Sequence, residues 1–563
     1  MSITKSVGHL FFMKTIIYIF LFFSFLAKSQ SNCAYWSTYI GKTDADAVRG
    51  IAVDNVKNSY IIMQTNSQSL TTTPGLISDT LKGFYDAYLA KFDSCGSFVW
   101  GTYLGTTGFD SGEKLVICSD GNIAFTGYSQ AAGLPTTSLS CFQATFAGQT
   151  DGFVGKITPN GNLIWLTYFG KSNSDLVYDI ACDFNGNLFI GGTTTSANLY
   201  TTTASFQQTF GGNTDAFIAK FGSTGNFKWC TYYGGMGVED IHALTTDVFG
   251  NIFGSGGTNS FNLNTSAGCT QPAKDNGFDC YLIKLDSVGT RIFSTYLGGN
   301  SGDDCYGLTS DNSGNLYVGG QTTSTNFTTT VGAYQPTLAG LQDLFLTKLS
   351  PNGNLLFSTF FGGSDNDATA RLKFNNNQLY AFVTTASNNI PILGSPTYST
   401  LVGFQNTAVV RFNTNGIPNY STYFGSSNFG VDEAFDIEIK NNNLFLAGKT
   451  GSSYYPTSTG AFQTLYGTND DGVLTRLSLN PTLLTVLNEQ TNLNEPTFYP
   501  NPANNVLFIK TTSNDLQNVK VFNAIGQQKQ TKFILENQLD VSHLECGIYF
   551  LKINNFLYKF IKQ

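Results

Sequence analysis

Residues 151–170 read Asp-Gly-Phe-Val-Gly-Lys-Ile-Thr-Pro-Asn-Gly-Asn-Leu-Ile-Trp-Leu-Thr-Tyr-Phe-Gly. Two short apolar runs flank the turn Pro159-Asn160-Gly161-Asn162, and this pattern predicts a β-hairpin. The chain repeats the pattern many times, so the repetition decides the fold.

The second strand of this hairpin opens with an aromatic residue, one further residue, Thr, and then Tyr or Phe. Such a motif begins seven times, at intervals of 63 to 65 residues, at Trp36, Trp100, Trp165, Trp229, Phe293, Phe357 and Tyr420. The first strand of the hairpin begins at Asp86, Asp151, Asp215, Asp279, Asp343, Asn406 and Asp471. Between hairpins lie two more strand-like runs, such as Ile180–Asp183 and Leu188–Thr193, so each unit contains about four strands.

Repeated four-stranded units predict an all-β, seven-bladed β-propeller. The ends of the array indicate how the ring closes. The motif at Trp36 has no hairpin partner before it, and Asp471–Leu477 has none after it. We therefore expect the N-terminal strand to close the last blade. A solenoid would instead need capping repeats.

One unit carries a family resemblance through Asp215–Phe221, Gly225-Asn226 and Trp229–Gly235. Its sequence resembles the bacterial SBBP, or beta-propeller, repeat. The resemblance implies a fold and no defined activity. The sixth unit departs most, with Asn406 in place of Asp and Asn375-Asn376-Asn377 in place of the usual turn.

The C-terminal residues carry a second resemblance, which begins at Tyr499-Pro500-Asn501-Pro502 and continues through a strand with the Gly526 turn. They are similar to the type A sorting domain of the Bacteroidetes type IX secretion system, with matching positions also at Gly547, Tyr549, Lys559 and Lys562. This resemblance implies a small β-sandwich that directs passage across the outer membrane through the secretion machinery. It further implies removal of the domain, with the product attached to the cell surface or released.

The N-terminal residues predict a signal peptide, because Lys5 and Lys14 precede the apolar run Thr15–Leu26. The expected domains are a signal peptide over 1–30, the propeller over 31–480, a linker over 481–495 and the sorting domain over 496–563. No later apolar run is long enough for a membrane helix, so the mature chain is expected to have none.

Composition excludes several classes of function. A net charge of −8, with only 12% charged residues, gives no basis for binding nucleic acid. His242 is the one histidine between residues 31 and 480, which argues against multi-histidine zinc sites and catalytic triads. His242 occupies the repeat position that holds Tyr178 and Tyr306 in other units, so we expect it to be an ordinary repeat residue.

Ten cysteines in an exported chain permit disulfides. Cys269 with Cys280 is the expected pair, since they bracket one loop, and Cys33 with Cys95 is a second candidate.

One acidic residue precedes the first strand of every unit, and these residues are Asp46, Asp110, Asp175, Glu239, Asp303, Asp367 and Asp432. If that strand is innermost, the seven acids form a ring at one mouth of the channel that could hold Ca²⁺. The alternative is a structural role, in which each carboxylate accepts backbone N–H bonds between blades. No other cofactor is expected.

The repeated tryptophans are expected to pack between blades. Function is expected where the copies differ, in the loops Thr71–Tyr85, Asn259–Phe278 and Thr385–Phe404. The sequence thus predicts an exported binding module, adhesin-like or a scaffold for an extracellular glycan or protein. The alternative is a secreted polysaccharide-degrading enzyme that uses propeller carboxylates.

Overall fold

The computed structural model describes residues 35–137, 141–401, 403–427 and 430–479, and, nearer the C-terminus, 497–499, 503–510, 519–523, 527–535, 538–553 and 556–562. The chain divides into two compact units, Met1–Leu483 and Leu484–Gln563. The predicted signal peptide and linker lie outside the described residues, as do Cys33, Pro500, Asn501, Pro502 and Gly526.

The first unit is built from four-stranded antiparallel sheets, seven of them within its described residues. Their strands are β2(Asp46–Val53), β3(Ser59–Thr65), β4(Asp86–Phe92) and β5(Phe98–Leu104); β6(Asp110–Ile117), β7(Ile123–Ser129), β8(Asp151–Ile157) and β9(Leu163–Phe169); β10(Asp175–Cys182), β11(Leu188–Thr194), β12(Asp215–Phe221) and β13(Phe227–Tyr233); β14(Ala243–Thr246), β15(Ile252–Thr258), β16(Asp279–Leu285) and β17(Arg291–Leu297); β18(Asp303–Ser310), β19(Leu316–Thr322), β20(Asp343–Leu349) and β21(Leu355–Phe361); β22(Asp367–Asn375), β23(Gln378–Thr385), β24(Asn406–Asn413) and β25(Pro418–Phe424); and β26(Asp432–Lys440), β27(Asn443–Thr450), β28(Asp471–Ser478) and β1(Trp36–Ile40). The predicted all-β class and four-stranded repeats are confirmed.

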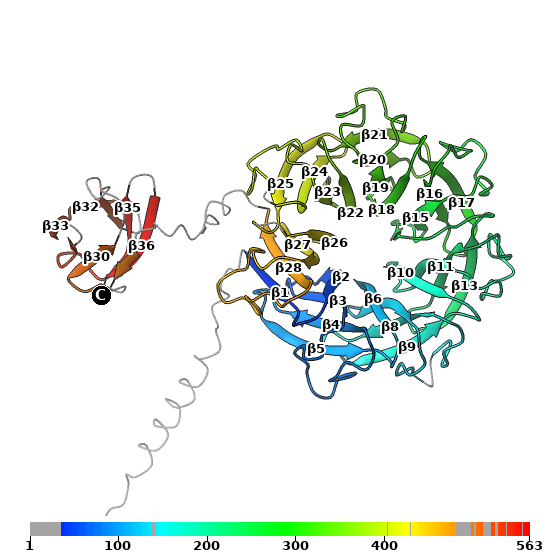
Figure 1. The fold of residues 1–563 in the computed structure, drawn as a ribbon, viewed down its shortest axis with the longest axis horizontal. Coiled ribbons are helices and arrows are strands. Elements are labelled where there is room, and N and C mark those ends of the chain that lie inside the picture. The colour runs from blue at the N-terminus through cyan, green and yellow to red at the C-terminus, as the bar shows by residue number, and fades with distance from the viewer. Residues whose placement is uncertain are drawn as a thin grey trace, which may run out of the picture. The chain divides into compact units, whose positions relative to one another are not determined.

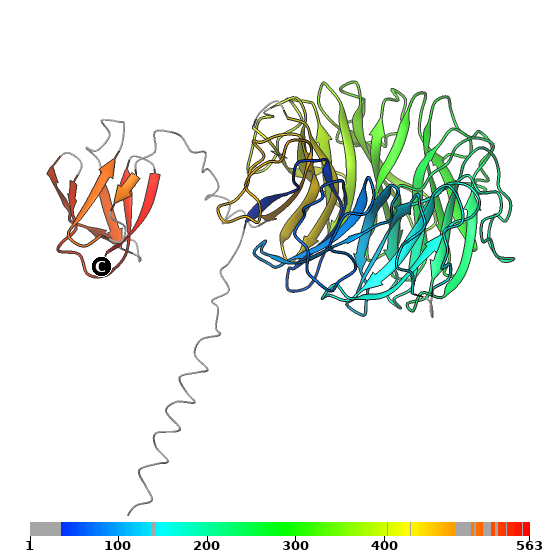
Figure 2. The same ribbon diagram turned by 60° about the horizontal axis from the view of Figure 1, so that its bottom comes forward.

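The sheets stand around a common centre, with the first strand of each innermost (Figure 1). Each inner strand contacts the inner strand of the next sheet, and β26 contacts β2, so the ring is closed. The view turned by 60° shows neighbouring sheets of the first unit standing side by side (Figure 2).

The N-terminal strand is the outer strand of the last sheet. β1 pairs antiparallel with β28, with Trp36 opposite Arg476 and Ile40 opposite Gly472. The Tyr39 hydroxyl donates to the carbonyl of Ser452 at 2.9 Å, across 413 residues of chain. This is the closure that the unpaired motifs at the two ends of the array predict.

The repeated aromatic position joins neighbouring sheets. Trp100, on β5, donates from Nε1 to the carbonyl of Pro159 at 3.0 Å, in the hairpin turn of the next sheet. Its ring lies against Gly161, where φ is 84° and an added Cβ would lie 3.1 Å from the indole. A glycine is needed there both for the positive φ and for the close approach of the ring. The packing role expected for the tryptophans is what these contacts describe.

The second unit contains two four-stranded sheets among its described residues. One consists of β29(Thr497–Tyr499), β30(Val506–Lys510), β34(Gln538–Asp540) and β33(Lys532–Leu535), and the other of β32(Gln528–Lys529), β31(Lys520–Asn523), β35(Gly547–Ile553) and β36(Phe556–Lys562). Residues from both sheets share one apolar core, including Leu507, Leu539, Val521 and Leu551. Gly547 opens β35, and the buried Tyr549 stacks on Phe560. No helix in the described parts of the chain is long and apolar enough to cross a membrane.

The disulfides correct the expected pairing of Cys269 with Cys280. Cys280 on β16 is bonded to Cys305 on β18 of the next sheet, with their Cα atoms 5.5 Å apart, and Cys269 is free. Cys269 belongs to a loop that follows the outer edge of β17, where the adjacent Gln271 carbonyl accepts the Tyr296 N–H, so adjacency in sequence does not bring it to Cys280. A second disulfide, Cys118–Cys182, also joins two neighbouring sheets. Cys95 is disulfide-bonded.

Candidate functional site: the central channel

The seven predicted acids lie at the same end of the innermost strands, and they are at most 1% exposed. Each accepts a hydrogen bond from a nearby backbone N–H, for example Gly235 to Glu239 at 2.7 Å and Gly363 to Asp367 at 2.7 Å. The donors to the other five are Lys42, Thr106, Lys171, Gly299 and Ser426. Side-chain hydroxyls add further bonds, such as Ser67 to Asp46 at 2.7 Å.

The carboxylates lie apart from the two cavities described in the channel. None of the seven is among the residues around its two cavities. Within the described chain, no group of three or more His, Cys, Asp or Glu residues is arranged to hold a metal ion. Burial raises the pKa of Asp46 and of Asp110 to about 6. The seven acids are thus buried and bonded to local backbone N–H groups, and their role as a ring that holds Ca²⁺ stays a prediction.

The channel is lined instead by residues at which the repeats differ. In six of the described inner strands the register with the second strand shifts at the third residue after the acid. Such a β-bulge re-aims the extra side chain. The residues at this position are Arg49, Glu113, Tyr178, His242, Tyr306, Ala370 and Phe435. One cavity of about 470 Å³ is lined by Arg49, Glu113, Tyr178, His242, Tyr306 and Phe435. We call it the His242 chamber.

His242 lies between the rings of Tyr178 and Tyr306, with centroid distances of 6.0 and 4.8 Å. Its Nε2 is 3.2 Å from Oδ2 of Asp240 and 3.9 Å from Oδ2 of Asp304. Burial alone would lower the pKa of His242, but the hydrogen bond and charge of Asp240, with the charge of Asp304, raise it. The expectation that His242 shares the Tyr178 and Tyr306 position holds, and that position faces the channel.

On the other side of this chamber, the Arg49 guanidinium lies 4.7 Å from the centroid of the Phe435 ring. Glu113 accepts the Ser111 hydroxyl at 2.5 Å. Burial raises the pKa of Glu113, although the charge of Arg49 opposes this. The chamber therefore combines aromatic faces with charges of both signs, which suits a polar ligand that carries apolar ring surfaces.

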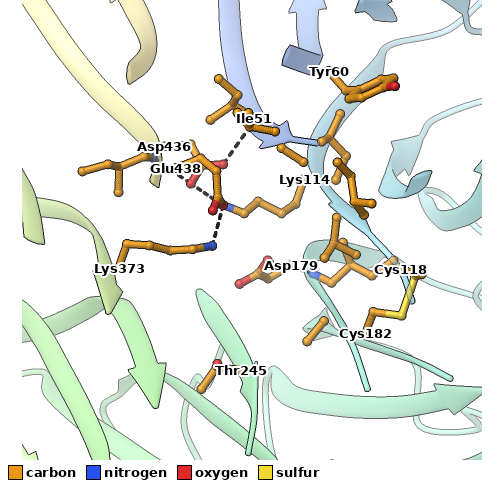
Figure 3. A pocket seen from close by; sticks show the side chains of 18 of the residues that line it. Ile51, Tyr60, Lys114, Cys118, Asp179, Cys182, Thr245, Lys373, Asp436 and Glu438 are labelled. Atoms are coloured by element: carbon orange, nitrogen blue, oxygen red, sulfur yellow. Dashed lines mark hydrogen bonds and ion pairs between the residues drawn. A yellow bond between two sulfur atoms is a disulfide. The ribbon is translucent and has the colours of Figure 1, made fainter. Parts of the chain in front are cut away.

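A second cavity, of about 710 Å³, occupies the opposite end of the inner strands (Figure 3). We call it the Lys114 chamber. Lys114 Nζ lies 2.5 Å from Oδ1 of Asp436, and Lys373 Nζ lies 2.6 Å from Oε2 of Glu438. Burial lowers the pKa of Lys114, although the charge of Asp436 opposes this.

Two buried carboxylates fix neighbouring inner strands at this chamber. Asp436 Oδ2 accepts the N–H of Ile51 at 2.8 Å, and Asp179 Oδ2 accepts the N–H of Leu244 at 2.8 Å. Burial raises the pKa of Asp179, against the opposing charge of Lys114. Arg371 lines both chambers and donates to the carbonyl of Tyr306 at 2.5 Å. These contacts hold the charged side chains in place.

The three irregular loops lie at the outer rim, away from these chambers. Backbone hydrogen bonds join two of these loops to the outer strands. The N–H of Tyr103 on β5 bonds to the Ser78 carbonyl, and the N–H of Tyr423 on β25 bonds to the Tyr398 carbonyl. Each exposes one phenylalanine: Phe84 at 71%, Phe261 at 68% and Phe404 at 67%. The prediction that these loops carry function stays a prediction.

Sequence reasoning missed the channel residues. The signal was present, since aligning the seven inner strands gives two adjacent positions whose residue type changes from copy to copy. The second of these holds Gly50, Lys114, Asp179, Ala243, Gly307, Arg371 and Asp436. The alignment does not show the bulge, present in six of the described inner strands, that turns the first of these positions toward the channel.

Comparison with protein families gives two matches. A beta-propeller repeat model, SBBP, matches residues 36–71, 164–200 and 292–328. A secretion system C-terminal sorting domain model matches residues 497–563. Both resemblances noted in the sequence are thereby confirmed.

Two curated proteins are similar to parts of the chain. The regulatory protein FlaEY of Caulobacter vibrioides is 24% identical over 393 residues, which cover 65% of this chain and 40% of that protein. An uncharacterized WD repeat-containing protein, L264, of Acanthamoeba polyphaga mimivirus is 23% identical over 257 residues, covering 38% of this chain and 18% of that protein. The matches thus span less than half of either relative.

Among solved structures, the Neurospora crassa Pan2 WD40 domain aligns with 79% of this chain and 97% of its own, at 9% identity and a TM-score of 0.38. The polysaccharide lyase Uly1 aligns with 77% of this chain and 90% of its own, at 10% identity and a TM-score of 0.38.

Proposed function

We propose that this protein, which carries beta-propeller repeats and a secretion-system C-terminal sorting domain, is an exported binding module whose ligand enters the central channel. In this proposal the seven sheets are the blades of one propeller over residues 31–480. The two sheets near the C-terminus form a β-sandwich sorting domain over 496–563, joined by the linker 481–495.

The sorting-domain match supports the route. We propose that the signal peptide 1–30 directs export and that the type IX secretion machinery recognises the sorting domain. The machinery then delivers the propeller to the cell surface or the extracellular space. Tyr499, Gly547, Tyr549, Lys559 and Lys562 fall within the matched residues and are the proposed recognition positions, together with Pro500, Asn501, Pro502 and Gly526.

One observation carries the binding role. The framework positions repeat in nearly every sheet, but the bulge position in the His242 chamber holds Arg49, Glu113, Tyr178, His242, Tyr306 and Phe435. A residue that serves only packing has no reason to change while its surroundings stay constant. Aromatic faces next to charges favour an extracellular glycan, because sugar rings stack and their hydroxyls bond to charged groups.

A glycan array probed with the full chain tests this role, followed by calorimetry with a glycan that binds. We expect Tyr306→Ala and Arg49→Ala each to weaken binding at least about tenfold, as removal of a well-placed anchor does. Phe84→Ala, in an outer loop, is the matched control and should bind as the unchanged protein does. If Phe84→Ala abolishes binding and the two channel variants do not, the ligand site lies in the loops.

A second candidate function follows from Glu113. Its raised pKa favours a neutral carboxyl group, which is the form a general acid needs. A secreted polysaccharide-degrading enzyme would release product from a bound glycan and lose this activity in Glu113→Gln, with binding retained. Binding without any product formation favours the module.

A further inference from the structure

A second kind of site lies between the sheets, outside the channel. Each junction brings together the first residue of a third strand and the acid at the start of the next inner strand, or, for Glu239, four residues before it. The backbone N–H of the second residue bonds to the carbonyl just before the first, as in Glu239 to Thr214 at 2.9 Å. The pairs are Asp471 with Asp46, Asp86 with Asp110, Asp151 with Asp175, Asp215 with Glu239, Asp279 with Asp303, Asp343 with Asp367, and Asn406 with Asp432.

At two junctions, Asp343–Asp367 and Asp471–Asp46, both carboxylates lie beside one glycine. A Cβ atom added to Gly362 would lie 2.5 Å from Oδ1 of Asp343 and 2.9 Å from Oδ2 of Asp367. Both aspartates are at most 1% exposed. Two carboxylates buried so close together repel each other strongly unless a positive charge or a proton lies between them.

Part of this oxygen surface has no partner. Oδ2 of Asp215 accepts the Gly211 N–H at 2.8 Å and the Gln207 amide at 3.2 Å. Its Oδ1 is buried and accepts no hydrogen bond in the described structure, and the same holds for Oδ1 of Asp151 and Asp471. The carbonyl oxygens of Gly234 and Gly235 also face this loop, 3.0 and 2.6 Å from a Cβ placed on Gly211. The junction therefore presents oxygens without a matching donor.

One junction contains a cation of its own. The Lys274 ammonium lies 3.7 Å from Oδ1 of Asp279 and 3.1 Å from the carbonyl of Asp275, and it also contacts the Gly277 carbonyl. The Lys274 side chain is fully buried. In the other repeats the corresponding position, five residues before the third strand, is apolar: Leu81, Phe146, Phe210, Leu338, Leu401 and Tyr466. The ammonium is thus a cation held by carboxylate and carbonyl oxygens, at a position that is apolar in the other repeats.

We propose that the junctions with two carboxylates and no buried lysine bind a hard divalent cation, Ca²⁺ or Mg²⁺, and that Lys274 replaces this ion between Asp279 and Asp303. Such ions take carboxylate and carbonyl oxygens as ligands. Five junctions meet this description. The junction that follows the sixth sheet does not, because it pairs Asn406 with Asp432 and so has one carboxylate instead of two. The Asp215–Glu239 junction is the reference site, because Oδ1 of Asp215 accepts no hydrogen bond there and the Gly234 and Gly235 carbonyls face the same loop.

Calorimetric titration of the full chain with Ca²⁺ and, separately, with Mg²⁺ after EDTA treatment tests the proposal. We expect measurable heat with at least one ion and a rise in Tm of about 5 °C at saturating ion. Asp215→Asn should lower the number of ions bound by one. Lys274→Met should raise it by one, because it frees the Asp279–Asp303 site.

Asp79→Asn, at an exposed loop position, is the matched control and should leave the stoichiometry unchanged. No heat and no change in Tm with either ion overturns the proposal, and a proton shared by each pair then explains the burial. Binding that is unchanged in both Asp215→Asn and Lys274→Met also overturns it. Should Asp215→Asn fail to fold, the Lys274→Met stoichiometry decides. None of these outcomes depends on a glycan ligand.

Discussion

Asp436 stabilises the channel through both of its oxygens. Oδ1 forms an ion pair with the Lys114 ammonium, and Oδ2 accepts a hydrogen bond from the Ile51 N–H of the neighbouring inner strand. The Asp436 side chain is 5% exposed. A charge in such a place depends on its partner, because removing one member leaves the other buried and unpaired.

We therefore expect Asp436→Asn to lower the free energy of unfolding by about 3 kcal/mol, as when a buried pair is broken. Urea denaturation measures the change. Lys373→Met is the matched control, because the Lys373 side chain is 40% exposed and its ion pair with Glu438 is worth at most about 1 kcal/mol. Equal losses in the two variants would contradict the role given to Asp436.

His242 provides a pH-dependent prediction. Its pKa is raised above 6.5 by Asp240 and Asp304 despite burial. A raised folded-state pKa contributes stability that is complete below the unfolded value and is lost as pH rises through the folded value. Stability should thus fall from about pH 6 upward, and His242→Gln should flatten this part of the profile.

The measurement is an NMR titration of the histidine ring, alongside Tm against pH. Only three histidines are present, at 9, 242 and 543, so assignment is direct. Asp304→Asn should lower the pKa of His242. If the pKa of His242 in the unchanged protein lies at or below its ordinary value, then Asp240 and Asp304 do not stabilise the charged ring as expected.

At the scale of elements, two disulfides tie neighbouring sheets. Cys118–Cys182 closes a stretch of 64 residues and Cys280–Cys305 one of 25. Cross-links of this kind stabilise mainly by restricting the unfolded chain, typically by about 2–4 kcal/mol.

The double variant Cys118→Ser/Cys182→Ser should therefore lower the free energy of unfolding by about 2–4 kcal/mol. Denaturant unfolding measures it, and peptide mapping of the unreduced protein checks the pairing. Cys269→Ser is the control and should have little effect, since Cys269 is free. A peptide that links Cys269 to Cys280 would refute the pairing described here.

For the whole molecule, closure of the ring depends on β1. Removing residues 35–41 would leave the edge of β28 unpaired and remove the buried Trp36 and Tyr39. Exposed strand edges pair with other chains.

We expect this deletion to lower Tm markedly and to produce soluble aggregates, measured by differential scanning fluorimetry and size-exclusion chromatography. Deletion of residues 484–563, the second compact unit, is the control and should leave the unfolding transition of the first unit unchanged. An unaltered monomer after loss of β1 would mean that closure does not depend on this strand.

The sequence by itself determined the repeat unit, the four strands in each unit, the completion of the last sheet by the N-terminal strand and the two family resemblances. These follow from short-range features: alternation of apolar residues, Gly turns and recurrence of Trp100-like positions. Each copy encodes them locally, so no long-range contact is needed to identify them.

Only the tertiary structure decided which residues meet. Arg49, Glu113 and His242 are roughly one repeat or more apart, yet they line one chamber, with bulges at Arg49 and Glu113 and with His242 directly before β14. The same holds for Cys118 with Cys182, and for Asp471 with Asp46, which meet because the ring closes. The physical reason is that sheet packing and bulge register, rather than local propensity, determine which side of an inner strand faces the channel.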